Sequence, residues 1–369
     1  MTTMQNPYRK SRYWLKGNIH VHSDRSTRAS LAGFDSEHGR SIEEIYARSC
    51  QPPFNFDFIC ASISVFDDGI QLFADTPENE KVTAIPGREI QNETVNHGTY
   101  TGGYFESPEA KYLHVLTIGN PGGLSICCHP MFFEKGRPRN GGAWKNIKSA
   151  LLNPCEKLAE LKVAGIEIYN GLTMMENHFV DGTYGADYAQ GCWGDMLMAG
   201  YRYLGFAGND EFYREPYIYE YFSPLGYIQV ACDDRSVASI LAAITRGQFY
   251  ASTGIQLAET PLEVETQPDG VEFSLAACDE VIWSAIVHEK SGPDGWALNR
   301  YTIAQSDSCH YRQTREWKYI RFQAQHPYNP LIRAWLQPLY GPCWEDHDAA
   351  PREGANEDAV HPGRPPRAI

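Results

Sequence analysis

Six short apolar segments of this chain carry or end in side chains of the types that commonly bind metal ions. Between residues 17 and 210, apolar runs typical of buried strands hold or precede histidine, glutamate or aspartate, and helical stretches separate several of them. The side chains concerned are His20, His22, Glu89, His114, His129, Glu167 and Asp210. Apolar strands that alternate with helices predict parallel β/α units with both sheet faces covered. Because the carboxyl ends of such strands meet at one rim, we expect these side chains to converge.

The segment Gly17–Ser23 holds the clearest part of this pattern. In an extended strand alternate side chains point the same way, so His20 and His22 project from one face while Ile19 and Val21 pack on the other. Neutral imidazole is the commonest metal ligand in proteins. A solvated or hydrogen-bonded pair is an equally good interpretation of these two residues alone, so a metal site needs carboxylates from other segments.

Composition narrows the class of protein. The 369 residues include 32 basic and 46 acidic side chains, and the net charge of -14 offers no general attraction to nucleic acid or to anionic membranes. Because no signal-like segment and no run of about 18 apolar residues occurs, we expect a cytoplasmic protein that does not span a membrane. The ten cysteines lack CxxC spacing and are interpreted as reduced thiols. The expected partner is a small-molecule substrate, and a homo-oligomer is left open.

Apolar periodicity and capping residues predict the individual elements. Strands are expected over 56–63, 81–85, 112–118, 124–128, 163–169 and 203–207, and helices over 143–161 and 192–199 and from Ser41 and Ser236. Farther on, the runs 271–275, 281–287, 318–324 and 332–336 alternate with turn residues and predict a small antiparallel β-sandwich. The segment 345–369 is rich in proline, glycine and charge, and it is predicted to be a flexible tail.

Taken in order, these motifs resemble the polymerase and histidinol phosphatase (PHP) superfamily. The segments Gly165–Gly171, Trp193–Gly200 and Gly247–Gly254 are similar to its carbaryl-hydrolase-like branch, and the resemblance covers roughly residues 13–340. It implies an α/β fold with a distorted (β/α)7-type, TIM-like PHP barrel over residues 1–255. A small C-terminal β-sandwich module would follow over residues 256–344, ahead of the tail.

The resemblance also implies a set of ligands and other site residues. His20, His22, Glu89 and Asp210 match the family's first metal site, and Glu89, as a bridging carboxylate, matches the second site together with His114 and His129. His97 lies nearer to Glu89 in the sequence and is an alternative to His114. The predicted catalytic residues are Glu89 and Asp210, and the candidate substrate contacts are Arg88, Glu167, Tyr213 and Arg214. For Glu167, orienting a ligand histidine and forming a buried ion pair are alternatives to substrate contact.

Three positions depart from the family pattern. Thr27, Ser64 and Phe212 stand where members with three metals carry Asp, His and His. Their joint replacement implies that the third site is lost while two divalent ions, Zn, Mn or Fe, remain. Without the third ion, a phosphodiester or a neutral ester, amide or carbamate is favoured over a phosphomonoester.

The implied function is that of a metal-dependent, phosphoesterase-like hydrolase. A metal-bound hydroxide would attack a phosphoester, a carboxylic or carbamate ester, or an amide. Two alternatives stay open: a catalytically silent PHP-like protein that binds a ligand, and an iron-dependent oxidative enzyme on the same scaffold. Cys127 and Cys128 adjoin His129, and packed strand positions are the preferred interpretation of both.

Overall fold

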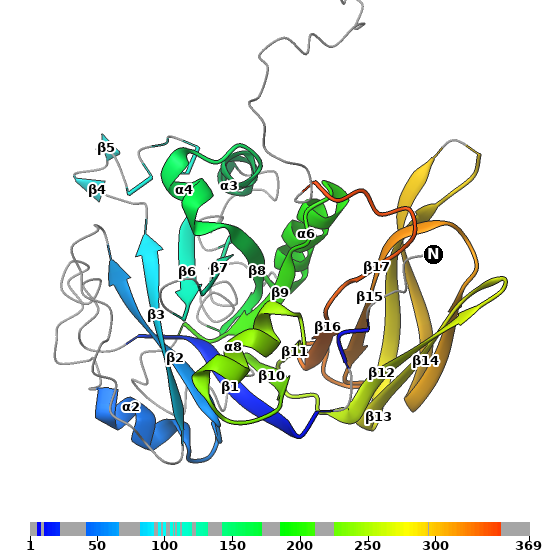
Figure 1. The fold of residues 1–369 in the computed structure, drawn as a ribbon, viewed down its shortest axis with the longest axis horizontal. Helices are drawn as coiled ribbons and strands as arrows, with labels where there is room; N and C mark the ends of the chain where they lie inside the picture. Colours follow the sequence, from blue (N-terminus) through cyan, green and yellow to red (C-terminus); the bar gives the residue numbers. More distant parts are fainter. Residues whose placement is uncertain are drawn as a thin grey trace, which may run out of the picture.

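The protein is a mixed α/β structure built on one large sheet (Figure 1). The computed structural model describes residues 6–8, 11–22, 42–65, 82–91, 95–96, 99–100, 104–105, 107, 109–110, 113–119, 123–131, 142–171, 185–210, 225–293 and 295–347. The helices are α2 (Ile42–Ser49), α3 (Gly142–Leu152), α4 (Glu156–Leu161), α6 (Gly185–Met198) and α8 (Val237–Thr245). None of these described helices is long and apolar enough to cross a membrane.

The strands of the N-terminal part carry the predicted site. They are β1 (Tyr13–His22), β2 (Phe58–Val65), β3 (Thr83–Gln91), β6 (His114–Ile118), β7 (Leu124–Cys127), β8 (Val163–Asn170), β9 (Leu204–Gly208), β10 (Tyr227–Cys232) and β11 (Phe249–Ser252), with β4 (Val95–Asn96) and β5 (Thr99–Tyr100) as a separate pair. The main sheet runs β11-β10-β1-β2-β3-β6-β7-β8-β9. Although β9 ends this path, it also contacts β1, so this part of the sheet curls back on itself.

The direction of the strands differs from the prediction. The pairs within β1-β2-β3 and β7-β8-β9 are parallel, whereas β3-β6, β6-β7, β1-β10 and β10-β11 are antiparallel. The expectation of parallel units throughout was therefore wrong at these four pairs. Ile118 and Leu124 are joined by only a short connection, which permits an antiparallel pair but not a parallel crossover.

Most predicted elements are present, with one helix divided in two. The helix expected over 143–161 is interrupted between α3 and α4 at Asn153-Pro154-Cys155. Proline lacks an N–H and disfavours a helical conformation in the residue before it, so a continuous helix cannot pass this point. The helix predicted from Ser236 is confirmed, because the Ser239 backbone N–H donates to Ser236 Oγ at 3.2 Å.

The C-terminal strands extend the same sheet. They are β12 (Leu257–Gln267), β13 (Gly270–Lys290), β14 (Trp296–Gln313), β15 (Trp317–Gln325), β16 (Arg333–Leu336) and β17 (Leu339–Tyr340). Neighbouring strands are antiparallel, as expected, and the runs 271–275 and 281–287 belong to the single long strand β13. Because β16 pairs with both β15 and β11, the described strands form a continuous sheet, and the structure does not show a separate sandwich.

Two groups of buried side chains stabilise these regions. One is formed by the N-terminal strands and the helices that pack against them, and the other lies along β11 to β16. Helix α6 lies between the two regions in Figure 1. The ring of Trp193, a buried residue of α6, lies 4.7 Å from the guanidinium of Arg321 in β15. Burying apolar surface stabilises the folded chain by about 25 cal/mol per Å². The close packing that results holds the site residues in place.

Candidate metal centre

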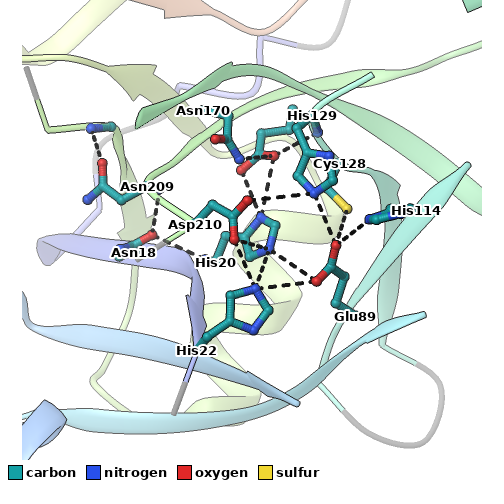
Figure 2. A network of polar contacts seen from close by, with 12 residues as sticks. Asn18, His20, His22, Glu89, His114, Cys128, His129, Asn170, Asn209 and Asp210 are labelled. Carbon is teal, nitrogen blue, oxygen red and sulfur yellow. Dashed lines mark hydrogen bonds and ion pairs between the residues drawn. The ribbon is translucent and has the colours of Figure 1, made fainter. Parts of the chain in front are cut away.

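The predicted ligands converge at the ends of five strands of the curled sheet (Figure 2). His20 and His22 project from the same face of β1, as alternation requires, while Ile19 and Val21 are buried on the other. Glu89 comes from β3, His114 from β6, His129 from the turn after β7, and Asp210 from the turn after β9. His20, His22 and Glu89 have 0% exposed surface, so the cluster lies in the protein interior.

One group of donor atoms gathers around the two β1 histidines. The Nε2 atoms of His20 and His22 are 3.2 Å apart, and Asp210 Oδ1 lies 3.4 Å from the first and 2.9 Å from the second. Glu89 Oε2 lies 3.3 Å from His22 Nε2 and 3.9 Å from His20 Nε2. Four donor atoms from three strands therefore face a common point.

A second group gathers around the other oxygen of Glu89. Glu89 Oε1 lies 2.8 Å from His114 Nδ1 and 3.0 Å from His129 Nε2. Asp210 Oδ2 is 3.7 Å from His129 Nε2, while its partner oxygen faces the β1 histidines. Both carboxylates consequently lie between two sets of imidazoles, as Figure 2 shows. Glu89 thus lies between the two sets of imidazoles, and its predicted role as a bridge between two cations stays a prediction. Asp210 contacts both histidines of β1 and, at a longer distance, His129 of the second set.

Glu167 supports both groups from behind. Its Oε1 lies 3.2 Å from His20 Nδ1, and its Oε2 accepts 2.9 Å hydrogen bonds from the His129 backbone N–H and the Asn170 side-chain amide. Because a carboxylate can only accept, we assign the donor hydrogen to His20 Nδ1. When the ring is neutral, this leaves the Nε2 lone pair directed at His22 and Asp210. A carboxylate behind a histidine fixes the tautomer in this way at many metal sites.

The backbone is strained at two of the site residues. His129 and Asp210 have φ values of 26° and 53°, in the left-handed region that non-glycine residues rarely occupy. The hydrogen bond to Glu167 holds the first of them, and Asn18 ties the turn before the second to β1. The Asn18 Oδ1 atom accepts from the backbone N–H of His20 at 3.1 Å and of Asn209 at 3.4 Å.

The close approach of β9 to β1 requires a glycine. A Cβ added at Gly208 would lie 2.5 Å from Glu167 Oε1 and 3.0 Å from His20 Cβ. Real Cβ atoms do not approach this closely, so any larger residue would displace the carboxylate or separate the two strands.

Opposite charges determine the protonation of the cluster. Burial is the largest influence on each group and disfavours every charge, but the charges of Asp210 and Glu167 hold the pKa of His20 well above its ordinary value. The pKa of His22 is raised by Asp210 and Glu89 despite the same burial. Conversely, the pKa values of Glu89 and Asp210 are lowered by the surrounding histidines. Without a cation, protons on His20 and His22 balance the carboxylates.

The donor atoms fit a divalent cation. Bonds of about 2.0–2.1 Å to nitrogen and oxygen in a tetrahedral site place neighbouring donors about 3.3 Å apart. The 2.9–3.9 Å separations in the first group are of this size. The two oxygens of the buried Asp210 lie against imidazole nitrogens, 2.9 Å from His22, 3.4 Å from His20 and 3.7 Å from His129. Two imidazole nitrogens 3.2 Å apart repel each other unless a proton or a cation lies between them. A buried His/Glu/Asp arrangement of this kind supports divalent metal binding.

No protein-family model and no curated protein matches the chain. Among solved structures, the chain is similar to a two-domain protein from Bacteroides vulgatus ATCC 8482 that contains a predicted PHP-like metal-dependent phosphoesterase. The two share 14% sequence identity over 92% of this chain and 98% of the other, with a TM-score of 0.41. Similarity at this level does not establish a shared activity.

The remaining predicted residues are less closely connected to the cluster. Arg88 is half-buried, and alternation along β3 directs it to the opposite face from Glu89, so its contact with substrate stays a prediction. Tyr213 and Arg214 lie outside the described residues, as do Thr27, Phe212 and the alternative ligand His97. The backbone of Ser64 pairs with that of Glu89 between β2 and β3. The predicted loss of a third metal site is thus untested.

Sequence reasoning missed one member of the cluster. Cys128 was interpreted as a packed strand residue, but its Sγ lies 3.7 Å from Glu89 Oε1. The ligand atoms of His20, Glu89, Cys128 and His129 all lie within 4.8 Å of one another. Burial raises the pKa of the Cys128 thiol well above its ordinary value, and the charge of Glu89 adds to this effect. The only available signal was its position directly before His129.

Proposed function

We propose that the protein is a metal-dependent hydrolase with a centre for two divalent cations. The observation that carries this proposal is that Glu89 and Asp210 each direct one oxygen to the β1 histidines and the other toward His129. Two adjacent donor sets joined by carboxylates suit a pair of cations. The ligands would be His20, His22, Glu89 and Asp210 on one side and Glu89, His114 and His129 on the other.

Bound cations would supply Lewis-acid polarisation of the scissile group and a water of lowered pKa. The chain's own residues prepare that chemistry. Glu167 orients His20, and the buried surroundings strengthen every electrostatic interaction in the site. Glu89 holds the two donor sets at a constant separation. Asp210 Oδ2, which makes no hydrogen bond among the described residues, is the atom to which we assign proton transfer.

Zn, Mn and Fe suit the imidazole and carboxylate donors. For the substrate we propose a phosphodiester or a neutral ester, amide or carbamate, because the family resemblance implies that Thr27, Ser64 and Phe212 stand at the positions of a third cation's ligands. Arg88, Tyr213 and Arg214 are proposed substrate contacts. We also propose that residues 1–255 form a PHP-like barrel and residues 256–344 a β module, which the two groups of buried side chains support.

Metal analysis combined with a panel of substrates tests the function. The protein is purified without chelators, its metal content is measured by mass spectrometry, and hydrolysis of nitrophenyl phosphodiester, phosphomonoester, acetate and carbamate substrates is followed. We expect two equivalents of metal and turnover of the diester or of a neutral substrate. His20→Ala should lose metal and more than about 100-fold of the activity while it stays folded. His310→Ala, on the exposed face of β14, is the matched control.

The outcomes separate the classes of function. A protein without metal or turnover would be a ligand-binding protein, and the hydrolase proposal would be abandoned. Iron accompanied by oxygen consumption but no hydrolysis would indicate the oxidative enzyme. Full activity and unchanged metal content in His20→Ala would show that the cluster is not the active centre.

A further inference from the structure

Cys128 is in direct contact with the cluster. Cys128 follows the last residue of β7, and its backbone N–H donates to the carbonyl of His114 at 3.2 Å. This hydrogen bond fixes Cys128 beside the first residue of β6. Its side chain is 1% exposed, and Sγ lies 3.7 Å from Glu89 Oε1 (Figure 2). The thiol thus lies on the same side of the site as His129, next to the carboxylate oxygen that faces the second donor set.

The neighbouring Cys127 provides an internal comparison. Both thiols are buried, but strand alternation separates their directions. The sulfur of Cys127 lies 3.9 Å from the backbone carbonyl oxygen of Cys128, and Cys127 is not part of the groups of possible metal ligands found among the described residues. Of two adjacent cysteines with similar burial, only the second has a sulfur atom among imidazole nitrogens and carboxylate oxygens.

The geometry points to Cys128 as a direct thiolate ligand of the cation held by Glu89 and His129, which makes the second site a mixed nitrogen, oxygen and sulfur site. This inference rests on the proposed metal centre. With a metal–sulfur bond of about 2.3 Å and a metal–oxygen bond of about 2.0–2.2 Å, tetrahedral donors lie about 3.5 Å apart. The observed 3.7 Å between Cys128 Sγ and Glu89 Oε1 is close to this value. As the metal–sulfur bond forms, the S–H bond breaks and its proton leaves to solvent, so no oxidant or reductant is needed.

A thiolate ligand would determine which metal the second site prefers. Sulfur is a soft donor that favours Zn²⁺, Co²⁺ and Fe²⁺, whereas Mn²⁺ and Mg²⁺ prefer oxygen donors. The first donor set, which holds two imidazoles and two carboxylates without sulfur, would discriminate less. The two sites would consequently differ in metal preference, with the thiophilic ion at Cys128.

Cobalt spectroscopy tests this assignment directly. Metal-depleted wild-type protein is titrated with Co²⁺, and the near-ultraviolet sulfur-to-cobalt charge-transfer band and the visible ligand-field bands are recorded. We expect the charge-transfer band in the wild type and in Cys127→Ser, and its loss in Cys128→Ser with the ligand-field bands retained. Zn²⁺ affinity at one site should fall at least about tenfold in Cys128→Ser, since even residues that only orient ligands contribute this much. Mn²⁺ affinity should be unchanged.

Each result has a distinct meaning. Cobalt that binds to the wild type without the charge-transfer band overturns the role of Cys128 and leaves the hydrolase proposal intact. Failure to bind cobalt at all overturns both. A band that persists in Cys128→Ser but disappears in Cys127→Ser would identify Cys127 as the thiolate ligand and overturn the assignment to Cys128. Absence of the band from the wild type decides against Cys128 whether or not Cys128→Ser folds. When the band is present, Cys128→Ala serves as a second variant that assigns it, and persistence of the band in both variants would overturn the role of Cys128.

Discussion

Replacement of Glu167 by glutamine tests how the centre is built. The two donors of fixed direction, the His129 backbone N–H and the Asn170 amide, both point at Oε2. The single oxygen of glutamine must therefore occupy this position, 3.4 Å from His20 Nδ1, and its NH2 group takes the closer Oε1 position, 3.2 Å from the same nitrogen. Two N–H groups cannot face each other at this distance. His20 would adopt the other tautomer, with its hydrogen on Nε2 and no lone pair for a cation.

The size of the effect follows from this loss. Residues that orient metal-bound histidines typically contribute a factor of about 10–100 in metal affinity, or roughly 1.4–2.8 kcal/mol. One hydrogen bond to a charged group, worth about 1.5–3 kcal/mol, gives the same range. We expect Glu167→Gln to weaken Zn²⁺ binding by this factor, although Glu167 itself is not a ligand and the substitution preserves side-chain volume.

Competition with a chromophoric zinc chelator measures the affinity, and urea unfolding of the metal-free protein shows whether the variant keeps its fold. Glu160→Gln, the same chemical change at an exposed position of α4, is the control. Zinc affinity in Glu167→Gln within twofold of the wild type would refute the idea that this carboxylate sets the tautomer of His20.

Three further predictions concern packing and protonation. Gly208→Ala should lower the free energy of unfolding in urea by about 1–3 kcal/mol and weaken zinc binding, because the added Cβ would lie 2.5 Å from Glu167 Oε1. Gly191→Ala, where a Cβ meets open space, should not lower the free energy of unfolding. Equal effects of the two substitutions would contradict this packing argument. Burial lowers the pKa of Lys16 to about 8, so as the pH rises this ammonium group loses its proton in the folded protein before it does in the unfolded chain. The free energy of unfolding should therefore rise between pH 8 and 10.5, by at most about 3 kcal/mol. Lys16→Met should abolish this rise, and a stability difference between the two proteins that does not vary with pH would argue against the prediction. The raised pKa of His20 means that its proton stabilises the metal-free protein at low pH, and that this contribution is lost as the pH rises. Zinc must displace this proton, so zinc affinity and the fall in Tm on chelation should both be larger at pH 8 than at pH 6. Calorimetry at both pH values measures them, and equal values at the two pH values would contradict the prediction.

Local rules predicted much of the secondary structure. The apolar strand periods, the capping Ser236 and the pairing of His20 with His22 on one face depend on neighbouring residues, and all are present in the structure. The prediction was wrong where chain direction mattered, at β6 and β7, because alternation is the same in parallel and antiparallel strands. It was also wrong at Pro154, where the helical period continues across a residue that ends the helix.

Residue order alone predicted which residue types could meet, namely paired imidazoles on β1 and carboxylates and histidines at later strand ends, and the family resemblance added a bridging role for Glu89. The folded chain adds that Asp210 contacts histidines of both donor sets, that Glu167 contacts His20, and that Cys128 rather than Cys127 faces the cluster. The difference arises from distance along the chain. Periodicity and capping report interactions over a few residues, whereas these contacts depend on the order of the strands and on the curl that brings β9 against β1.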